Sequence, residues 1–301
     1  MKQIKKLLIV FVLVLVVLLI GCSYNEEKLK VIVPSGTPLV SIGPSLNNKN
    51  YEIEIVSGSD LLSSALIKGE YDIVIAPINL GAKLYLKGNN KYALDSVITT
   101  GNSYLINLNN KPLSNDAKIL AFGMNNTADI MMKLYLGDLS FQIEYQSAVS
   151  DVIPFIISGS DYDYYLVSEP FLSQLKIKYQ LNFTIIDLEE EIDEISFFPQ
   201  AGIYVNKESN NSLIDKFITE TKENIEFLNE NSEDYYEKVK DSHSYFKNLT
   251  ESVLESSIKL SKIRYIKASS NKDNIIEYFN LLNDFNNKIL EGEVPDEAFF
   301  R

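Results

Sequence analysis

The first two thirds of the chain alternate between strand-like and helix-like patterns. Residues 51–56, Tyr-Glu-Ile-Glu-Ile-Val, alternate apolar and acidic side chains as a half-buried strand does. In the next stretch, leucines and an alanine recur at helical spacing between an N-cap at Ser59 or Asp60 and a stop at Gly69. Residues 73–76 are continuously apolar, which is typical of a parallel strand covered on both faces. The pattern therefore predicts a strand–helix–strand unit.

The same order of pieces recurs over residues 141–170. This second copy has a strand, a polar turn, a helix ending at Gly159 and an apolar strand that starts, like the first, with Tyr-Asp and ends with Pro. Residues 29–33 and 118–122 supply one opening strand for each copy. A strand–helix–strand crossover is the usual way to make parallel neighbours. We therefore expect an α/β fold with two lobes.

After Gly202 the pattern changes from alternating strands and helices to almost continuous helix. Capped amphipathic stretches cover residues 213–228, 233–240, 251–262 and 272–290. The apolar positions of the last stretch recur with a period of 3.6 residues, which predicts a helix packed against the first lobe. The chain then visits lobe one, lobe two and lobe one again.

These patterns divide the chain into four parts. We expect a signal peptide at 1–21, a tether at 22–28, lobe one at 29–103 and 207–301, and lobe two at 104–206. Lobe two includes two crossing strands, 104–108 and 203–206, which would act as hinges.

The amino-terminal segment has the pattern of a bacterial lipoprotein signal. Lys2, Lys5 and Lys6 precede an apolar run at 7–20, which is shorter than the roughly 20 residues of a spanning helix. An uncleaved anchor is the alternative. Cys22 is the only cysteine and follows the apolar run directly, so cleavage would leave it as the lipidated amino terminus. The folded body is therefore expected outside the cytoplasm, anchored to the outer face of the cytoplasmic membrane.

Composition and charge exclude several classes of protein. The chain has 28 Lys and Arg against 41 Asp and Glu, a net charge of −13, and no basic cluster for nucleic acid. One cysteine permits no internal disulfide, and 46% hydrophobic residues supply material for packed cores. We expect a monomer.

Several segments resemble a known family. They are residues 69–85, in which Ile-Ala-Pro-Ile-Asn-Leu-Gly-Ala is the most specific part, and then 101–104, 169–170, 199–202 and 295–299. This sequence is similar to the extracytoplasmic solute-binding proteins of ABC importers in the nitrate, taurine and thiamine-precursor group, over residues 29–206 above all. The resemblance implies a type II periplasmic-binding fold. Its lobes would close on a small molecule and deliver it to the permease and ATPase subunits.

The resemblance also implies a set of ligand-binding residues at the turns between the lobes. In lobe one and the crossing these are Ser35, Gly36, Ser57, Ser59, Asp60, Pro77, Asn79, Asn102, Ser103 and Tyr104; in lobe two they are Asn125, Asn126, Thr127, Tyr145, Gln146, Ser168 and Glu169. Structural roles are the alternatives: Asn79 as a helix cap, Gly36 as a relief of turn strain and Glu169 as a solvated acid of a first helical turn.

Catalysis is not expected. Fungal relatives of the family consume a pocket histidine and carry a cysteine cluster for iron, but the only histidine here is His243, in the tail. No Ser-His-Asp triad, metal cluster or phosphate loop is evident, and the acidic run 189–194 is interpreted as a solvated loop. The sequence predicts a protein with no cofactor and no metal.

The charges near the expected cleft favour a particular ligand. Arginine occurs only at Arg264 and Arg301, outside the expected cleft, so a bidentate arginine clamp for an oxyanion is excluded. Glu169 would favour a cation or a hydrogen-bond donor, and tyrosines could cover an aromatic ring: Tyr104, Tyr145, Tyr164 and Tyr165. We expect a vitamin-precursor-like nitrogen heterocycle. Nitrate, sulfonate or taurine bound by helix amides is one alternative, and a surface lipoprotein acting as sensor or adhesin without transport is another.

Cys22→Ala should abolish lipid attachment and signal processing while both lobes still fold, because no other thiol can be acylated. Labelling of cells with radioactive palmitate measures this. A variant labelled as strongly as the wild type would contradict the lipoprotein interpretation.

Overall fold

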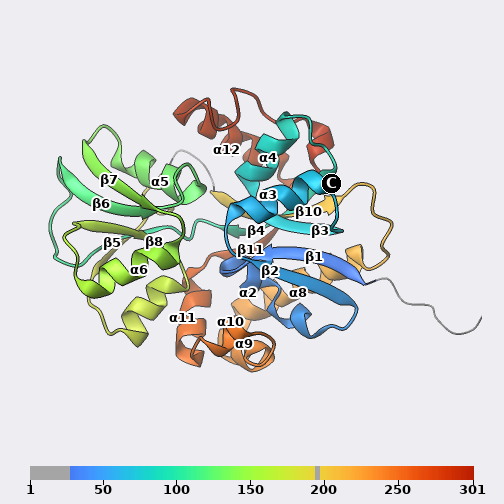
Figure 1. Cartoon of the computed structure of the whole chain (residues 1–301), viewed down its shortest axis with the longest axis horizontal. Coiled ribbons are helices and arrows are strands. Elements are labelled where there is room, and N and C mark those ends of the chain that lie inside the picture. The colour runs from blue at the N-terminus through green and yellow to red at the C-terminus, as the bar shows by residue number, and fades with distance from the viewer. Residues whose placement is uncertain (1–27, 194–196) are drawn as a thin grey trace, which may run out of the picture.

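The computed structural model describes residues 28–193 and 197–301, which form two α/β lobes (Figure 1). Lobe one is built on a six-stranded sheet and lobe two on a five-stranded sheet. The predicted signal peptide, Cys22 and all of the tether except Lys28 lie outside the described residues. Within the described part, no helix is both long and apolar enough to cross a membrane.

The sheet of lobe one has the order β11-β4-β10-β3-β1-β2. Its strands are β1 (Leu29–Pro34), β2 (Tyr51–Val56), β3 (Ile73–Pro77), β4 (Tyr92–Thr100), β10 (Pro199–Asn206) and β11 (Ile263–Lys267). β1 pairs in parallel with both β2 and β3, whereas β10 is antiparallel to β3 and β4. The predicted unit at 51–77 is therefore real, but its two strands flank the opening strand instead of pairing with each other.

The sheet of lobe two repeats this arrangement in the order β7-β6-β8-β5-β9. Its strands are β5 (Tyr104–Asn107), β6 (Ala117–Phe122), β7 (Phe141–Gln146), β8 (Tyr164–Val167) and β9 (Thr184–Asp187). β6 lies between β7 and β8 as β1 lies between β2 and β3. The internal repeat seen in the sequence thus corresponds to a repeated topology.

Helices cover both faces of each sheet. In the first two thirds they are α2 (Thr37–Ser41), α3 (Ser59–Lys68), α4 (Ile78–Leu86), α5 (Thr127–Leu136), α6 (Val149–Ser158) and α7 (Phe171–Ser173), with short turns η1 (Gly43–Asn47) and η2 (Gln174–Lys178). In the tail they are α8 (Ile214–Glu230), α9 (Ser232–Val239), α10 (Ser244–Lys247), α11 (Glu251–Leu260) and α12 (Lys272–Phe285), with η3 (Ala268–Ser270) and η4 (Glu297–Phe299).

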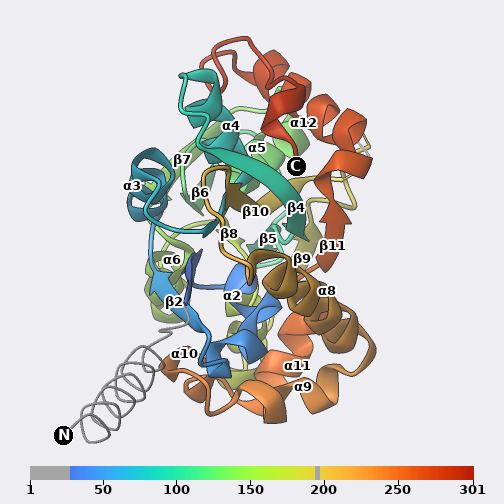
Figure 2. The ribbon, with the colours of Figure 1, turned by 90° about the vertical axis from the view of Figure 1, so that its right-hand side faces the viewer.

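Strand β3 shows why its sequence is continuously apolar. Ile73 and Ile75 face the core beneath α8, α9 and α11, whereas Val74 and Ala76 face the core beneath α3, α4 and α12. Both cores exclude water, so neither side of the strand can carry a polar residue. Figure 2 shows the two groups of helices on opposite sides of the strands of lobe one.

The tail is not purely helical, and the crossings between the lobes differ from those expected. Residues 263–267 form β11, which pairs antiparallel with β4. The strand expected as a crossing at 203–206 belongs to β10, inside the sheet of lobe one, because its backbone bonds are satisfied by β3 and β4. The chain instead crosses between the lobes at 101–103 and again after β9.

The tail also contacts lobe two, which the sequence did not predict. The hydroxyls of Ser173 in α7 and Ser256 in α11 lie 2.9 Å apart. The hydroxyls of Thr127 in α5 and Tyr278 in α12 lie 2.8 Å apart and are buried. The tail therefore packs on lobe one, as expected, and also bridges the two lobes.

Gly81→Ala should lower the free energy of unfolding by about 1–3 kcal/mol, the usual cost of overpacking a core. A Cβ at Gly81 would overlap the ring of Tyr204, whose hydroxyl is fixed by donating to the Ile78 carbonyl at 3.1 Å. Urea unfolding measures the change. Lys87→Ala, at the exposed end of the same helix, is the control and should stay within about 0.5 kcal/mol of the wild type. Equal effects of the two substitutions would contradict the tight contact.

Candidate functional site

A cleft of about 580 Å³ lies between the two lobes. Its walls are the turns after β1, β2 and β3 in lobe one and the turns after β6, β7 and β8 in lobe two. The carboxyl ends of parallel strands from both lobes thus face one cavity. In open α/β sheets this edge is where ligands bind, because the following helices direct their free amides into it.

Ten of the predicted ligand-binding residues line this cleft and seven do not. Those that line it are Ser35, Gly36, Ser57, Ser59, Pro77, Asn102, Asn126, Thr127, Ser168 and Glu169. Those outside its lining are Asp60, Asn79, Ser103, Tyr104, Asn125, Tyr145 and Gln146.

The residues outside the lining have other contacts. Asp60 is exposed in the first turn of α3. The Asn79 side-chain amide donates to the Asn125 carbonyl at 3.3 Å, a hydrogen bond that joins the lobes. The Ser103 hydroxyl donates to the Gly101 carbonyl at 3.1 Å, away from any ligand. Because the hydrogen-bonding groups of Asn79 and Ser103 are engaged within the protein, these residues hold the site in shape.

The four tyrosines expected to cover a ring lie in packed surroundings instead. The Tyr104 hydroxyl donates to the Leu260 carbonyl and the Tyr145 hydroxyl to Asp129 at 2.7 Å. Tyr164 and Tyr165 are buried in the cores of lobe two. Strand side chains alternate between faces, and the turn residues, not these strand residues, point into the cleft.

The sequence did not identify several residues that do line the cleft. Aromatic faces come from Phe122 at the end of β6, Phe171 at the start of α7 and Tyr245 of α10. Residues 148–150 line the cleft, whereas the predicted Tyr145 and Gln146, which precede them in the chain, do not. Phe122 ends a predicted strand and Phe171 follows another, so both could have been found from that position. Tyr245 lies in the tail, and nothing local in the sequence marks it.

Helix amino termini give the cleft a partial positive potential. Gly36 precedes α2 with φ 106° and Gly58 precedes α3 with φ 89°, a conformation that favours glycine. No side chain caps α3, and the residue before α6 is Ala148, which carries no hydrogen-bonding side chain. The first turn of α3 therefore has no side-chain cap, whereas in α6 the Asp151 amide is engaged, because it donates to the Ala148 carbonyl at 3.0 Å.

Among the residues that the structure describes, Glu169 is the only charged one in the lining, and it is 2% exposed. Its carboxylate accepts hydrogen bonds from the Ser173 hydroxyl at 2.8 Å and from the Ser173 backbone amide at 3.1 Å. Burial raises the pKa of Glu169 to about 7, although the hydrogen bonds from Ser173 lower it in part. None of the described residues that line the cleft is a lysine, arginine or histidine. The cleft therefore holds one carboxyl group that is close to half ionised at neutral pH.

Asn102 connects this carboxyl group to lobe one. Its side-chain oxygen accepts from the Glu169 backbone amide at 2.8 Å, and its side-chain amide donates to the Thr37 hydroxyl at 3.3 Å. Asn102 has φ 49° and is 3% exposed, so its geometry is set by the surrounding protein. Sequence analysis selected this residue, and the structure places it at the floor of the cleft where the chain crosses between lobes.

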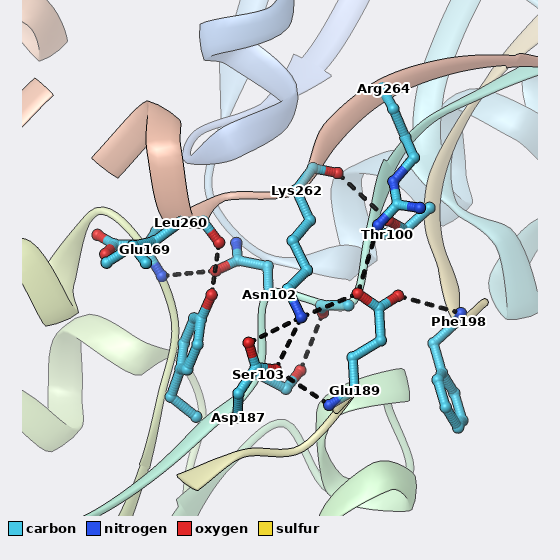
Figure 3. A network of polar contacts seen from close by, with 12 residues as sticks. Thr100, Asn102, Ser103, Glu169, Asp187, Glu189, Phe198, Leu260, Lys262 and Arg264 are labelled. Atoms are coloured by element: carbon cyan, nitrogen blue, oxygen red, sulfur yellow. Dashed lines mark hydrogen bonds and ion pairs between the residues drawn. The ribbon is translucent and has the colours of Figure 1, made fainter. Parts of the chain in front are cut away.

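An ion-pair network fixes the crossing beside the cleft (Figure 3). The Lys262 ammonium lies 2.8 Å from Asp187 and 3.0 Å from Glu189, and Arg264 lies 3.4 Å from Glu189. The Gly101 amide also donates to the Phe198 carbonyl at 2.9 Å, which joins the two crossing segments. The acidic run that starts at Glu189 was expected to be a solvated loop. Glu189 instead forms ion pairs with Lys262 and Arg264 of the tail.

The described part of the cleft carries polar groups of few kinds. Among residues 28–193 and 197–301, no group of three His, Cys, Asp or Glu residues could hold a metal ion. Its polar groups are hydroxyls, amides and a single carboxyl. They suit recognition by hydrogen bonds.

Comparisons with known proteins agree with this geometry. No protein-family model matches the chain, and no curated protein matches it. The structure of an ABC transporter protein from Parabacteroides distasonis superposes with a TM-score of 0.76 at 25% identity, covering 92% of this chain and 99% of that chain. The chain has the periplasmic-binding-protein fold. The predicted fold class is therefore confirmed.

Two further neighbours are sulfonate-binding proteins. The periplasmic aliphatic sulphonate binding protein SsuA from Escherichia coli gives a TM-score of 0.70 at 14% identity, covering 92% of each chain. The alkanesulfonate-binding protein SsuA from Xanthomonas axonopodis pv. citri gives 0.59 at 12% identity, covering 91% of this chain and 96% of that chain. At such identities the likeness extends to the fold alone.

The stability of the wild type relative to Glu169→Gln should fall as pH rises from 4.5 to 7. The folded-state pKa of Glu169 is raised from 4.5 to about 7, so in this window the folded protein binds more protons than the unfolded chain. At about 1.4 kcal/mol per pH unit, the total is about 3 kcal/mol, lost by pH 7 and constant above it. Urea unfolding of both proteins across this range measures the difference. If the free energies of unfolding of the two proteins changed in parallel with pH, the raised pKa of Glu169 would be contradicted.

Proposed function

We propose that this protein is the solute-binding component of an ABC importer. It captures a small molecule between its lobes and delivers it to a permease that works with an ATPase. The observation that carries this proposal is the shared cleft, in which turns from both lobes face one cavity of about 580 Å³. A ligand in contact with both walls favours the closed arrangement, and that arrangement is what a permease could recognise. The protein acts by binding, without catalysis.

Anchoring completes this proposal. Lipidation of Cys22 would hold the lobes at the outer face of the cytoplasmic membrane through the tether at 22–28. The first described strand, β1, starts at Leu29, directly after the tether. The tether is short, so it would keep the cleft near a permease in the same membrane.

For the ligand, we propose an uncharged or cationic nitrogen heterocycle. Within residues 28–193 and 197–301, the cleft lining offers no cationic side chain to neutralise an anion, and Glu169 is better satisfied by a donor or a positive charge. The rings of Phe122, Phe171 and Tyr245 supply flat apolar faces in place of the tyrosines expected from the sequence. A planar ring with hydrogen-bond donors on its edge fits both features.

The helix amino termini support a second candidate, a sulfonate such as taurine or an alkylsulfonate. Amides at the starts of α3 and α6 can bind an anion without arginine. Glu169 would then have to be protonated, so sulfonate binding should weaken above pH 7, whereas binding of a cationic heterocycle should strengthen. The pH dependence of binding therefore separates the two ligand classes.

A thermal-shift screen tests the ligand class. Aminopyrimidines and flavin-like rings should raise the melting temperature more than nitrate, taurine or alkylsulfonates, since a ligand at 100 times its Kd adds about 2.7 kcal/mol of stability. Glu169→Gln should weaken heterocycle binding by about 1.5–3 kcal/mol, the range for a hydrogen bond to a charged group.

Glu223→Gln, an exposed change on α8, is the matched control and should leave binding unchanged. If only oxyanions stabilise the protein, the heterocycle is excluded and the helix amides are the main ligand groups. If no small molecule of either class binds, the remaining candidate is a surface lipoprotein acting as sensor or adhesin.

A further inference from the structure

Tyr245 has a buried hydroxyl without a hydrogen-bond partner. Its oxygen is inaccessible to solvent, and no described residue bonds to it. Other buried tyrosines are satisfied: the hydroxyl of Tyr235 donates to the Val40 carbonyl, that of Tyr204 to the Ile78 carbonyl, and that of Tyr278 contacts Thr127. An unpaired buried hydroxyl is costly, so one that persists needs an explanation.

The position of Tyr245 supplies that explanation, because the residue lines the ligand cleft. Its backbone amide donates to the His243 ring nitrogen at 3.1 Å, at the start of α10. Its ring packs edge-on against Phe246, with centroids 5.1 Å apart, and Phe246 is fully buried. The ring is thus held in place by protein contacts, while its hydroxyl has no partner among the described residues.

Tyr245 and Glu169 both line the cleft. Burial raises the pKa of Tyr245, and the negative charge of Glu169 raises it further. The phenol therefore stays protonated and is available as a donor. Glu169 keeps acceptor capacity beyond its two bonds from Ser173, because a carboxylate has about four lone-pair sites.

We propose that Tyr245 is a ligand-binding residue that donates its hydroxyl proton to an acceptor on the ligand while Glu169 accepts a hydrogen bond from a donor on the same ligand. This deepens the proposed function and rests on it. The ligand class is a nitrogen heterocycle with a ring-nitrogen acceptor and an exocyclic amine, as in a 4-aminopyrimidine. A ligand of this kind satisfies both groups. An anion that has only acceptors offers Glu169 no donor and is repelled by its carboxylate.

Tyr245→Phe tests this, with Tyr235→Phe as the matched control. Because the Tyr245 hydroxyl has no hydrogen-bond partner, Tyr245→Phe should not lower the melting temperature of the ligand-free protein. It should raise the Kd for 4-aminopyrimidine about tenfold. Tyr235→Phe removes a satisfied hydroxyl, so it should lower the melting temperature by about 2–4 °C and leave the Kd unchanged. Calorimetric titration and thermal unfolding provide the two readouts.

A second probe separates the roles of the two residues. 4-(Dimethylamino)pyrimidine keeps the ring nitrogens but has no N–H donor. Tyr245→Phe should weaken the binding of both probes about equally, whereas Glu169→Gln should weaken only the binding of 4-aminopyrimidine.

The outcomes distinguish this inference from the proposed function. If Tyr245→Phe lowers the melting temperature as Tyr235→Phe does and leaves the Kd unchanged, the hydroxyl is structural and the inference is overturned, while binding by the wild type leaves the proposed function standing. If the wild type binds alkylsulfonates but neither pyrimidine at millimolar concentration, the inference is overturned and the importer role remains. If it binds none of these, the inference and the proposed ligand class both fall.

Discussion

The side chain of Asn102 determines how the two lobes meet at the floor of the cleft. Its oxygen satisfies the buried backbone amide of Glu169, and its amide reaches the Thr37 hydroxyl at the start of α2. A buried amide left without this acceptor would cost about as much as a lost hydrogen bond. The same contact sets the position from which the Glu169 side chain reaches Ser173. The polar character of the cleft therefore depends on one residue in a left-handed conformation at the crossing.

Two opposing electrostatic effects act within the cleft. The amino termini of α3 and α6 provide partial positive charge, which favours the ionised form of a nearby carboxyl group. Burial of Glu169 favours the neutral form and outweighs the hydrogen bonds from Ser173, which raises the pKa of Glu169 to about 7. The ion pairs of Lys262 with Asp187 and Glu189 lie at the crossing between the lobes, outside the cleft lining. The carboxyl group of Glu169 thus keeps acceptor capacity for a ligand, because no described cationic side chain in the lining pairs with it.

Much of the fold and half of the site follow from local sequence patterns. Alternation at 51–56, the continuous apolar run at 73–76 and the turn residues Ser35, Ser57 and Asn126 predicted the strands and the lining, because strand ends and helix starts are set by neighbouring residues. The assignment of 203–206 to the other lobe was wrong because pairing partners are chosen in three dimensions. The expectation of cleft-lining tyrosines failed for the same reason: strand patterns do not reveal which buried face belongs to a core.

The cleft is completed by parts of the chain that lie far apart, from Pro34 to Tyr245. Contacts of such high sequence separation form slowly, since each requires the closure of a long loop. A chain synthesised from its amino terminus could pair the strands of lobe two well before α10 arrives. Completion of the cleft is therefore a late event in the folding of the molecule, and its lining is assembled only when the tail has docked.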